Sequence, residues 1–256
     1  MTTHTLDLLV RTVAPPAVEN RHAAAWALDF GTEGAPQVNV LSNESALPPR
    51  PPRPDELYLW FGEPMSPDWD QLLIHLRDAE RSQATRLRRP ADRWSFSAAH
   101  LGLHALLARA LDCPPCEIAF KCGAHGKPVL DPARHDTGVH FNISHTDGLV
   151  AVALAGRPVG VDVERVRELE DMQAVADSVF ATETISALAN TFGRAARRAS
   201  FFRFWTLGEA FIKVTGEGLT QGLETFAFST NRVPCLTRVS GAWSPKGRWR
   251  FGAFPA

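Results

Sequence analysis

The sequence contains no apolar run approaching the roughly 20 residues that a membrane-spanning helix needs. Its first residues, MTTHTLDLLVRTVAPPAV, also lack the basic start and the long apolar centre of a signal peptide. With a formal net charge of −1 over 256 residues, the chain has no charge excess that would attract nucleic acid or an anionic membrane. We therefore expect a cytoplasmic globular protein without nucleic-acid or membrane partners, in which any phosphate is recognised by a local cluster of side chains.

Cysteine is also scarce, because four residues in a chain of this length do not make a disulfide framework. Cys113, Cys116, Cys122 and His125 imitate the spacing of zinc ligands. The segment 117–121 alternates like a short strand, and an extended run from Cys116 to Cys122 would hold them roughly 20 Å apart. That separation is too large for one tetrahedral site, so we do not expect zinc.

The composition changes near residue 55. Residues 1–54 are rich in Ala, Pro, Asn and Ser and end in the proline-rich segment PPRPPRP at 48–54, which favours extended geometry. We predict that 1–54 is a poorly ordered N-terminal extension with a proline-rich linker. Two similar lobes, 55–156 and 157–256, are expected to follow, each with the order strand, helices, strands.

The segment 159–164, VGVDVE, alternates as a strand does. Asp162 and Glu164 then lie on one face, with Cα atoms roughly 6.5 Å apart. Two carboxylates so placed repel each other unless a cation lies between them, and Mg²⁺ accepts one or two carboxylates together with phosphate oxygens. The alternative is that both acids face solvent near Arg165 and Arg167.

The segment 200–219, SFFRFWTLGEAFIKVTGEGL, predicts an amphipathic helix that ends at Gly216. Its apolar surface contains one polar stripe, because Thr206, Glu209 and Lys213 are spaced three and four residues apart. A solvated Glu–Lys pair on the surface is the alternative interpretation of this stripe.

Weaker signals for a ligand-binding site lie between the proline-rich segment and the strand at 159–164. Arg86 and Arg93 belong to a basic turn that either is solvated or binds a phosphate. Lys127 lies in a Gly-rich turn, and Ser144-His145 ends the first strand of a predicted hairpin over 139–145 and 149–155. Each of these signals also fits an ordinary structural turn.

Four motifs in this order resemble the 4′-phosphopantetheinyl transferase family, in its larger, two-lobed monomeric form, often described as the surfactin-synthetase-activating kind. They are GKP (126–128), FNISHTDG (141–148), GVDVE (160–164) and FWTLGEAFIKVTGEGL (204–219). The resemblance covers about residues 56–254. It implies an α+β fold of two similar α/β lobes related by a pseudo-twofold axis, with coenzyme A as substrate in the cleft between the lobes.

The resemblance also assigns roles to residues. It implies that Asp162, Glu164 and Glu209 hold magnesium on the pyrophosphate of coenzyme A, and that Glu209 and Lys213 are catalytic. The coenzyme A contacts it implies are Lys127 and Pro128 beside the adenine nucleotide, Ser144, His145 and Lys213 at the phosphates, and Arg86 and Arg93 as candidates for the 3′-phosphate.

The implied reaction transfers the 4′-phosphopantetheine arm of coenzyme A to a serine of an apo acyl or peptidyl carrier protein and releases 3′,5′-ADP. The family's usual settings favour secondary metabolism. Arg194, Arg197 and Arg198 either attract an acidic carrier protein or form a solvated helix face. The rival hypotheses are a degenerate homologue that binds coenzyme A or a carrier without turnover, and a different magnesium enzyme such as a nucleotide phosphatase.

The chain departs from the family pattern at two places. Gly208 stands where the family usually has lysine, which removes a charge beside the predicted site. The chain ends at Ala256, whereas family members normally continue through a closing strand. We therefore expect the second lobe to lack an edge strand.

Overall fold

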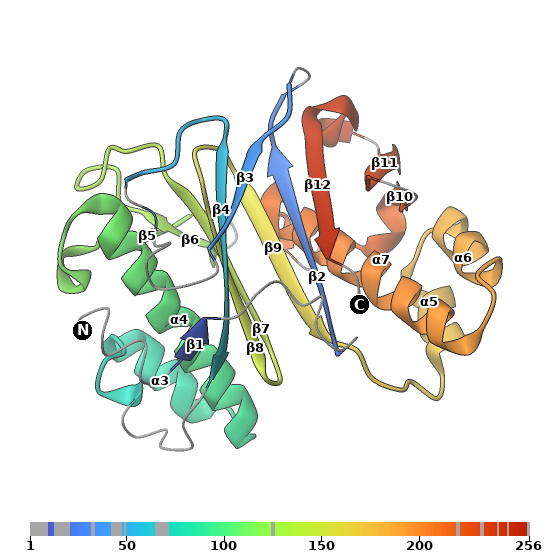
Figure 1. The fold of residues 1–256 in the computed structure, drawn as a ribbon, viewed down its shortest axis with the longest axis horizontal. Coiled ribbons are helices and arrows are strands. Elements are labelled where there is room, and N and C mark those ends of the chain that lie inside the picture. Colours follow the sequence, from blue (N-terminus) through green and yellow to red (C-terminus); the bar gives the residue numbers. More distant parts are fainter. Residues whose placement is uncertain are drawn as a thin grey trace. The chain divides into compact units, whose positions relative to one another are not determined.

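The structure is a computed structural model in which two compact units of the chain are distinguished (Figure 1). It describes residues 10–12, 21–31, 34–41, 48, 50–64, 72–123, 126–218, 221–230, 233–239, 241–244 and 246–254. Unit 1 comprises 1–15 and 37–157, and unit 2 comprises 16–36 and 158–256. Each unit consists of a β-sheet covered by one long helix, as expected for two similar α/β lobes.

Unit 1 is built on a sheet in the order β1–β4–β8–β7, with β3 pairing in parallel with β4. The helix α4 packs against β4, β7 and β8, and the buried side chains of these elements form one core. The bounds of its elements are β1 Val10–Thr12, β3 Gln37–Leu41, β4 Glu56–Pro64, α3 Asp78–Arg86, α4 Pro90–Leu111, β5 Phe120–Cys122, β6 Pro128–Leu130, β7 His140–Thr146 and β8 Leu149–Ala155.

The predicted hairpin is confirmed by the antiparallel pairing of β7 with β8. The helix α3 begins at Asp78, after a turn and bend at 74–76. The predicted strand over 117–121 is displaced, since 115–117 forms a 3-10 turn and β5 starts at Phe120.

Unit 2 is built on a three-stranded antiparallel sheet in the order β12–β2–β9, visible in Figure 1 as a blue strand between a red and a yellow one. The helix α7 packs against all three strands. The bounds of its elements are β2 His22–Asp29, β9 Val159–Arg165, α5 Met172–Val179, α6 Thr182–Ala189, α7 Arg194–Thr215, β10 Ala227–Ser229, β11 Cys235–Arg238 and β12 Trp249–Phe254.

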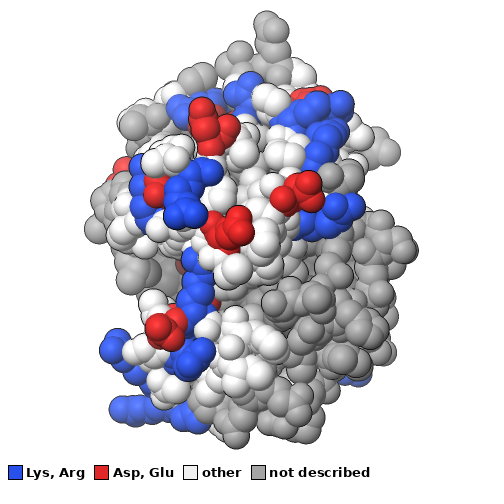
Figure 2. Space-filling model, turned by 90° about the vertical axis from the view of Figure 1, so that its left-hand side faces the viewer, with Lys and Arg blue, Asp and Glu red and all other residues white. Residues whose placement is uncertain are grey.

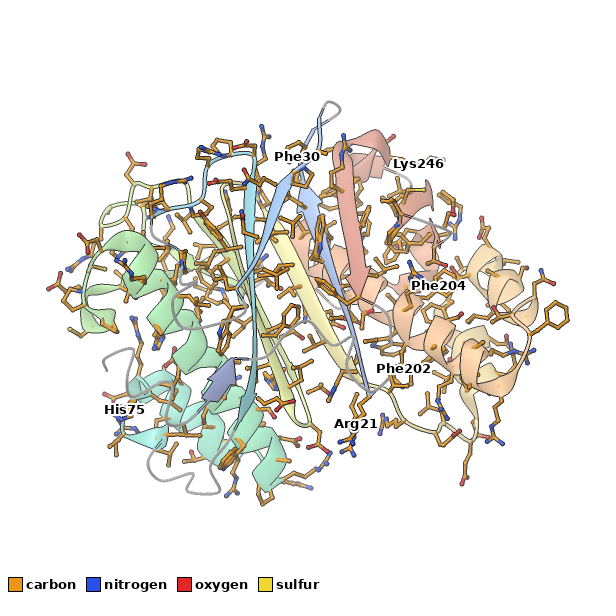
Figure 3. The ribbon with its side chains drawn as sticks, in the orientation of Figure 1. Arg21, Phe30, His75, Phe202, Phe204 and Lys246 are labelled. Carbon is orange, nitrogen blue, oxygen red and sulfur yellow. The ribbon has the colours of Figure 1, made fainter. Side chains whose placement is uncertain are left out.

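The helix α7 ends where the sequence predicts, because Gly216 has a left-handed φ of 77° and caps it. It begins six residues earlier than predicted, at Arg194. Its apolar side chains, among them Phe202 and Phe204 (Figure 3), are buried in the core of unit 2. This core is separate from that of unit 1.

The prediction of a poorly ordered extension over 1–54 is wrong for its described strands. β2 is the central strand of the unit 2 sheet, and β3 belongs to the sheet of unit 1. The proline-rich linker also packs on unit 1, because Arg50 donates hydrogen bonds of 2.7 and 2.8 Å to the buried carboxylate of Glu56. These bonds, together with one from the backbone N–H of Arg53, lower the pKa of Glu56 to about 2 although burial raises it.

Among the described residues the sheet of unit 2 has three strands, and β2 is the central one. This strand pairs with β9 on one side and with β12 on the other. The central strand of this sheet therefore comes from 16–36, a segment that lies between the two parts of unit 1 in the sequence.

Because Gly160 has no side chain, β9 lies closer to α7 at this position than it could with any other residue. A β-carbon added there would lie 2.0 Å from the carbonyl oxygen of Ala210 and 2.8 Å from the backbone nitrogen of Val214. Both atoms belong to the backbone of α7 and cannot turn aside as a flexible side chain would. The missing side chain therefore sets the separation between the strand and the helix that carry the predicted acidic residues.

We predict that Gly160→Ala lowers the free energy of unfolding by about 1–3 kcal/mol, the usual cost of overpacking a core. Urea denaturation measures this effect. Gly247→Ala is the matched control, because Gly247 is exposed and a β-carbon there meets no atom within 4 Å. Equal stability of the two variants would contradict the close approach at Gly160.

Candidate active site

The strand β9 presents its two acids toward α7. Asp162 is buried, with 4% of its surface exposed, and Glu164 is partly buried. The sheet register places Ala25 of β2 opposite Asp162 and Ala23 opposite Glu164. Because opposite residues of an antiparallel pair share a face, the two acids lie beside methyl groups rather than beside larger side chains.

The helix α7 brings a cation to these acids. Lys213 Nζ lies 2.7 Å from Asp162 Oδ1 and donates a second hydrogen bond of 3.1 Å to the carbonyl oxygen of Val161. Glu209 lies one turn before Lys213 on the same helix face. Thr206, the third member of the predicted polar stripe, is fully buried instead, and its hydroxyl bonds back to the carbonyl of Phe202 at 3.0 Å.

The three carboxylates influence one another electrostatically. Burial raises the pKa of Glu164 to about 7, and the nearby charge of Asp162 raises it further while Lys213 opposes the shift. Burial also raises the pKa of Glu209, again with a contribution from Asp162. Lys213 thus forms an ion pair with one acid, Asp162, and its charge favours ionisation of the other two without cancelling their pKa shifts.

The donor chemistry of this cluster fits a hard divalent cation, which prefers carboxylate oxygens. The negative charge of Asp162 contributes to the raised pKa values of Glu164 and Glu209. A divalent cation bound nearby would lower these pKa values again. In the part of the chain that the structure describes, however, no three His, Cys, Asp or Glu side chains are grouped closely enough to hold a metal ion. The ammonium of Lys213 lies against Asp162, so a cation there requires this side chain to move.

No zinc cluster is found among the described residues either. Cys113, Cys116 and Cys122 are free thiols, and His125 lies outside the described residues.

The other predicted contacts belong to unit 1. Ser144 and His145 lie near the end of β7, where Ser144 is buried and His145 partly buried. The ring of Phe96 in α4 packs edge-on against the ring of His145, with centroids 6.0 Å apart. The start of α4, which carries Arg93, is therefore joined to the end of β7.

The basic residues predicted to bind coenzyme A differ in their setting. Arg93 is partly buried and its Nε donates a 2.6 Å hydrogen bond to the carbonyl of Leu87, whereas Arg86 is exposed in the last turn of α3. Lys127 and Pro128 lead into β6, and the carbonyl of Lys127 accepts a 2.8 Å bond from the N–H of Gly123. Among the residues drawn in colour in Figure 2, acidic side chains lie between the basic ones over much of the visible face.

The departure at Gly208 is explained by packing. A β-carbon there would lie 2.3 Å from Leu223 Cδ2 and 3.4 Å from the ring of Phe226. A side chain at 208 would thus point into the core of unit 2, whereas Lys213 reaches Asp162. Lysine at this position would have to displace those apolar groups.

The arginines at the start of α7 are held by neighbouring groups. Arg194 and Arg198 form ion pairs with Glu168, and Arg197 donates bonds of 3.3 and 3.2 Å to the carbonyl of Thr191. Glu168 offsets the unfavourable placement of basic side chains at a helix N-terminus. The net positive charge at the start of α7 is therefore smaller than the three arginines alone would give.

The sequence is similar to those of known proteins over most of its length. A sequence model of the 4′-phosphopantetheinyl transferase superfamily matches residues 158–251, and a model of the N-terminal part of such transferases matches 60–157. The 4′-phosphopantetheinyl transferase HetI of Nostoc sp. is 30% identical over 204 residues, which cover 77% of this chain and 85% of that protein. The chain belongs to the 4′-phosphopantetheinyl transferase superfamily.

Other members of the superfamily align over shorter stretches. The transferase gsp of Aneurinibacillus migulanus is 30% identical over 155 residues, or 60% of this chain and 62% of that protein. Sfp of Bacillus subtilis is 25% identical over 171 residues, or 66% and 73%. The relatives are transferases, and this superfamily uses coenzyme A as substrate, typically with a divalent metal.

None of the described helices is both long enough and apolar enough to cross a membrane.

The pKa of Glu164 predicts a pH dependence of stability. Between about pH 4.5 and 7 the unfolded chain loses the Glu164 proton while the folded chain keeps it. The folded state then binds more protons, so the free energy of unfolding falls as the pH rises through this window. Glu164→Gln has no carboxylate to ionise, and we expect it to gain thermal stability over the wild type as the pH rises.

Thermal unfolding of both proteins in the presence of a chelator, from about pH 4.5 to 8, checks this prediction. Glu170→Gln removes an exposed acid from the segment that follows β9 and serves as the control. A constant difference in melting temperature between Glu164→Gln and the wild type would refute it.

Proposed function

We propose that this chain transfers the 4′-phosphopantetheine arm of coenzyme A to a serine hydroxyl of an apo carrier protein and releases 3′,5′-ADP. The observation that carries the proposal is the ion pair of Lys213 in α7 with Asp162 in β9, whose charges also act on Glu164 and Glu209, in a member of this superfamily. In the reaction the serine oxygen forms a bond to the β-phosphorus. The bond between this phosphorus and the bridging oxygen breaks, and the oxygen leaves with 3′,5′-ADP.

Asp162, Glu164 and Glu209 are the residues that would hold magnesium. When bound, the ion would neutralise charge on the pyrophosphate of coenzyme A. Lys213 would leave Asp162 and donate to the phosphate oxygens instead, because its ammonium and a metal ion compete for the same carboxylate. Lys213 and the ion together would supply the positive charge that phosphoryl transfer requires around the reacting group.

Glu209 would accept the proton of the attacking serine. Burial and the charge of Asp162 raise its pKa above the ordinary value for glutamate. A base whose pKa lies nearer to neutrality is better matched to proton transfer at physiological pH.

The proposal extends to unit 1. Ser144 and His145 are assigned to the phosphates of coenzyme A, Lys127 and Pro128 to its adenine nucleotide, and Arg86 and Arg93 to its 3′-phosphate. Of these, exposed Arg86 has its guanidinium available for a ligand, whereas Arg93 already donates to Leu87.

We predict that Asp162→Ala and Glu209→Ala each lower the rate of transfer by at least about 100-fold, since even groups behind metal ligands account for 10- to 100-fold. The measurement is the phosphopantetheine mass gained by an apo carrier protein, tried over a panel of acyl and peptidyl carriers. Circular dichroism shows that the variants fold. Full activity in either variant would overturn the site assignment.

The same assay separates the rival functions. Binding of coenzyme A without any gain of carrier mass would indicate a degenerate homologue. Release of inorganic phosphate from coenzyme A in the absence of a carrier would indicate a phosphatase.

We further predict that Lys213→Met raises the response of the coenzyme A-free protein to magnesium while it lowers the rate of transfer. Without the ammonium, Asp162 carries an unbalanced buried charge, which destabilises the metal-free protein. Magnesium should then increase the melting temperature more in this variant than in the wild type. Lys246→Met, a change of an exposed lysine outside the cluster, is the control. An unchanged or smaller magnesium response in Lys213→Met would contradict the competition.

A further inference from the structure

The strand β2 lies outside both matched ranges of the superfamily, which together begin at residue 60. It is nevertheless the central strand of unit 2. Within the described part of the chain, β9 hydrogen-bonds to no strand other than β2. The position of Asp162 and Glu164 in the sheet therefore depends on β2, which lies outside the matched ranges.

The register shows how β2 acts on the acids. Ala25 lies opposite Asp162, Ala23 opposite Glu164, and Ala24 opposite Val163. Ala23 and Ala25 belong to the core that contains the apolar side chains of α7, whereas Ala24 points to the other face of the sheet. A shift of this pairing by one residue would turn both acids away from α7.

Both ends of β2 are fastened to unit 2, which holds this register. At the start, the carbonyl of Arg21 accepts a 2.7 Å hydrogen bond from Val166, directly after β9. At the end, Asp29 forms an ion pair with Arg248, and the N–H of Phe30 donates to the carbonyl of Arg248 at 3.0 Å. Arg21 and Phe30 are labelled at the two ends of the strand in Figure 3.

We propose that β2 is a positioning element of the acidic centre, and that Ala25 is the residue through which it acts on Asp162. This inference rests on the proposed function. The methyl group of Ala25 occupies the α7 face of the sheet directly beside Asp162, where opposite side chains of an antiparallel pair have β-carbons roughly 5 Å apart. A small side chain there lets α7 approach β9, and so lets Lys213 Nζ reach Asp162 Oδ1 at 2.7 Å.

To test the proposal, a buried alanine is replaced by valine on each of the two faces of β2 in turn. Ala25→Val adds two methyl groups on the face of α7, and Ala24→Val adds them on the opposite face. Ala24 and Ala25 are adjacent and equally buried, each with 1% of its surface exposed. Valine is favoured in strands, so neither change disturbs the strand by its intrinsic preference.

Two quantities are measured on the full chain. The first is the magnesium concentration that half-saturates the rise in melting temperature of the coenzyme A-free protein, which reports binding to the folded state. The second is hydrogen exchange of the backbone amides of α7 between Glu209 and Lys213. We expect Ala25→Val to require roughly tenfold more magnesium, equivalent to 1.4 kcal/mol, and to exchange faster in this segment. Ala24→Val should match the wild type in both measurements, whatever its effect on overall stability.

Ala25→Ser keeps a small side chain at position 25, so this variant should have the same magnesium requirement as the wild type. If Ala25→Val does not fold, Ala25→Cys provides a smaller enlargement, for which we expect a shift in the same direction. Equal magnesium requirements in the variants at positions 24 and 25 would overturn the proposal, because β2 would then act on stability alone.

Measurements on the wild type distinguish a wrong role for β2 from a wrong proposed function. If magnesium neither raises its melting temperature nor supports transfer to any carrier, the proposed function fails. If the wild type responds to magnesium and Ala25→Val responds equally, the role of β2 fails and the proposed function stands.

Discussion

The close contact between β9 and α7 is the constraint on which the rest of unit 2 depends. At Gly160 the strand meets the backbone of the helix without an intervening side chain. Two residues further along the strand, this approach allows Lys213 to contact Asp162. A wider separation would leave Asp162 buried without its ammonium partner, and an unbalanced buried charge is strongly destabilising.

The same contact determines the chemistry available to the site. Burial that is needed to pack α7 on the sheet also raises the pKa values of Glu164 and Glu209. A single ammonium balances only part of the charge when all three acids are ionised. Ionisation of Glu164 and Glu209 is therefore disfavoured by burial and by the charge of Asp162.

Much of the site could be predicted from local patterns. The alternation of 159–164 placed Asp162 and Glu164 on one face, and the helical spacing placed Glu209 beside Lys213. These predictions succeeded because each depends only on the geometry of one element. The partner of the Lys213 ammonium could not be predicted, since it is determined by how closely α7 approaches β9.

The strand β2 was missed for a different reason. Its sequence, HAAAWALD, is rich in alanine, which is depleted in strands, and it shows no alternation because both of its faces are buried. Its pairing partners lie more than 100 residues away in the sequence, so no local signal marks them. Gly160 did carry a signal, because glycine inside a strand often indicates the close approach of another backbone.

The path of the chain through unit 2 has a consequence for its synthesis. The strand β2 is synthesised well before its neighbours, because β9 follows only after the whole of unit 1 and β12 follows β9. Until then the alanine-rich strand has neither of its neighbours, while unit 1 already has every strand of its sheet. Such distant pairing makes folding slow, so β2 can position the acidic residues only after β9 and α7 have been synthesised.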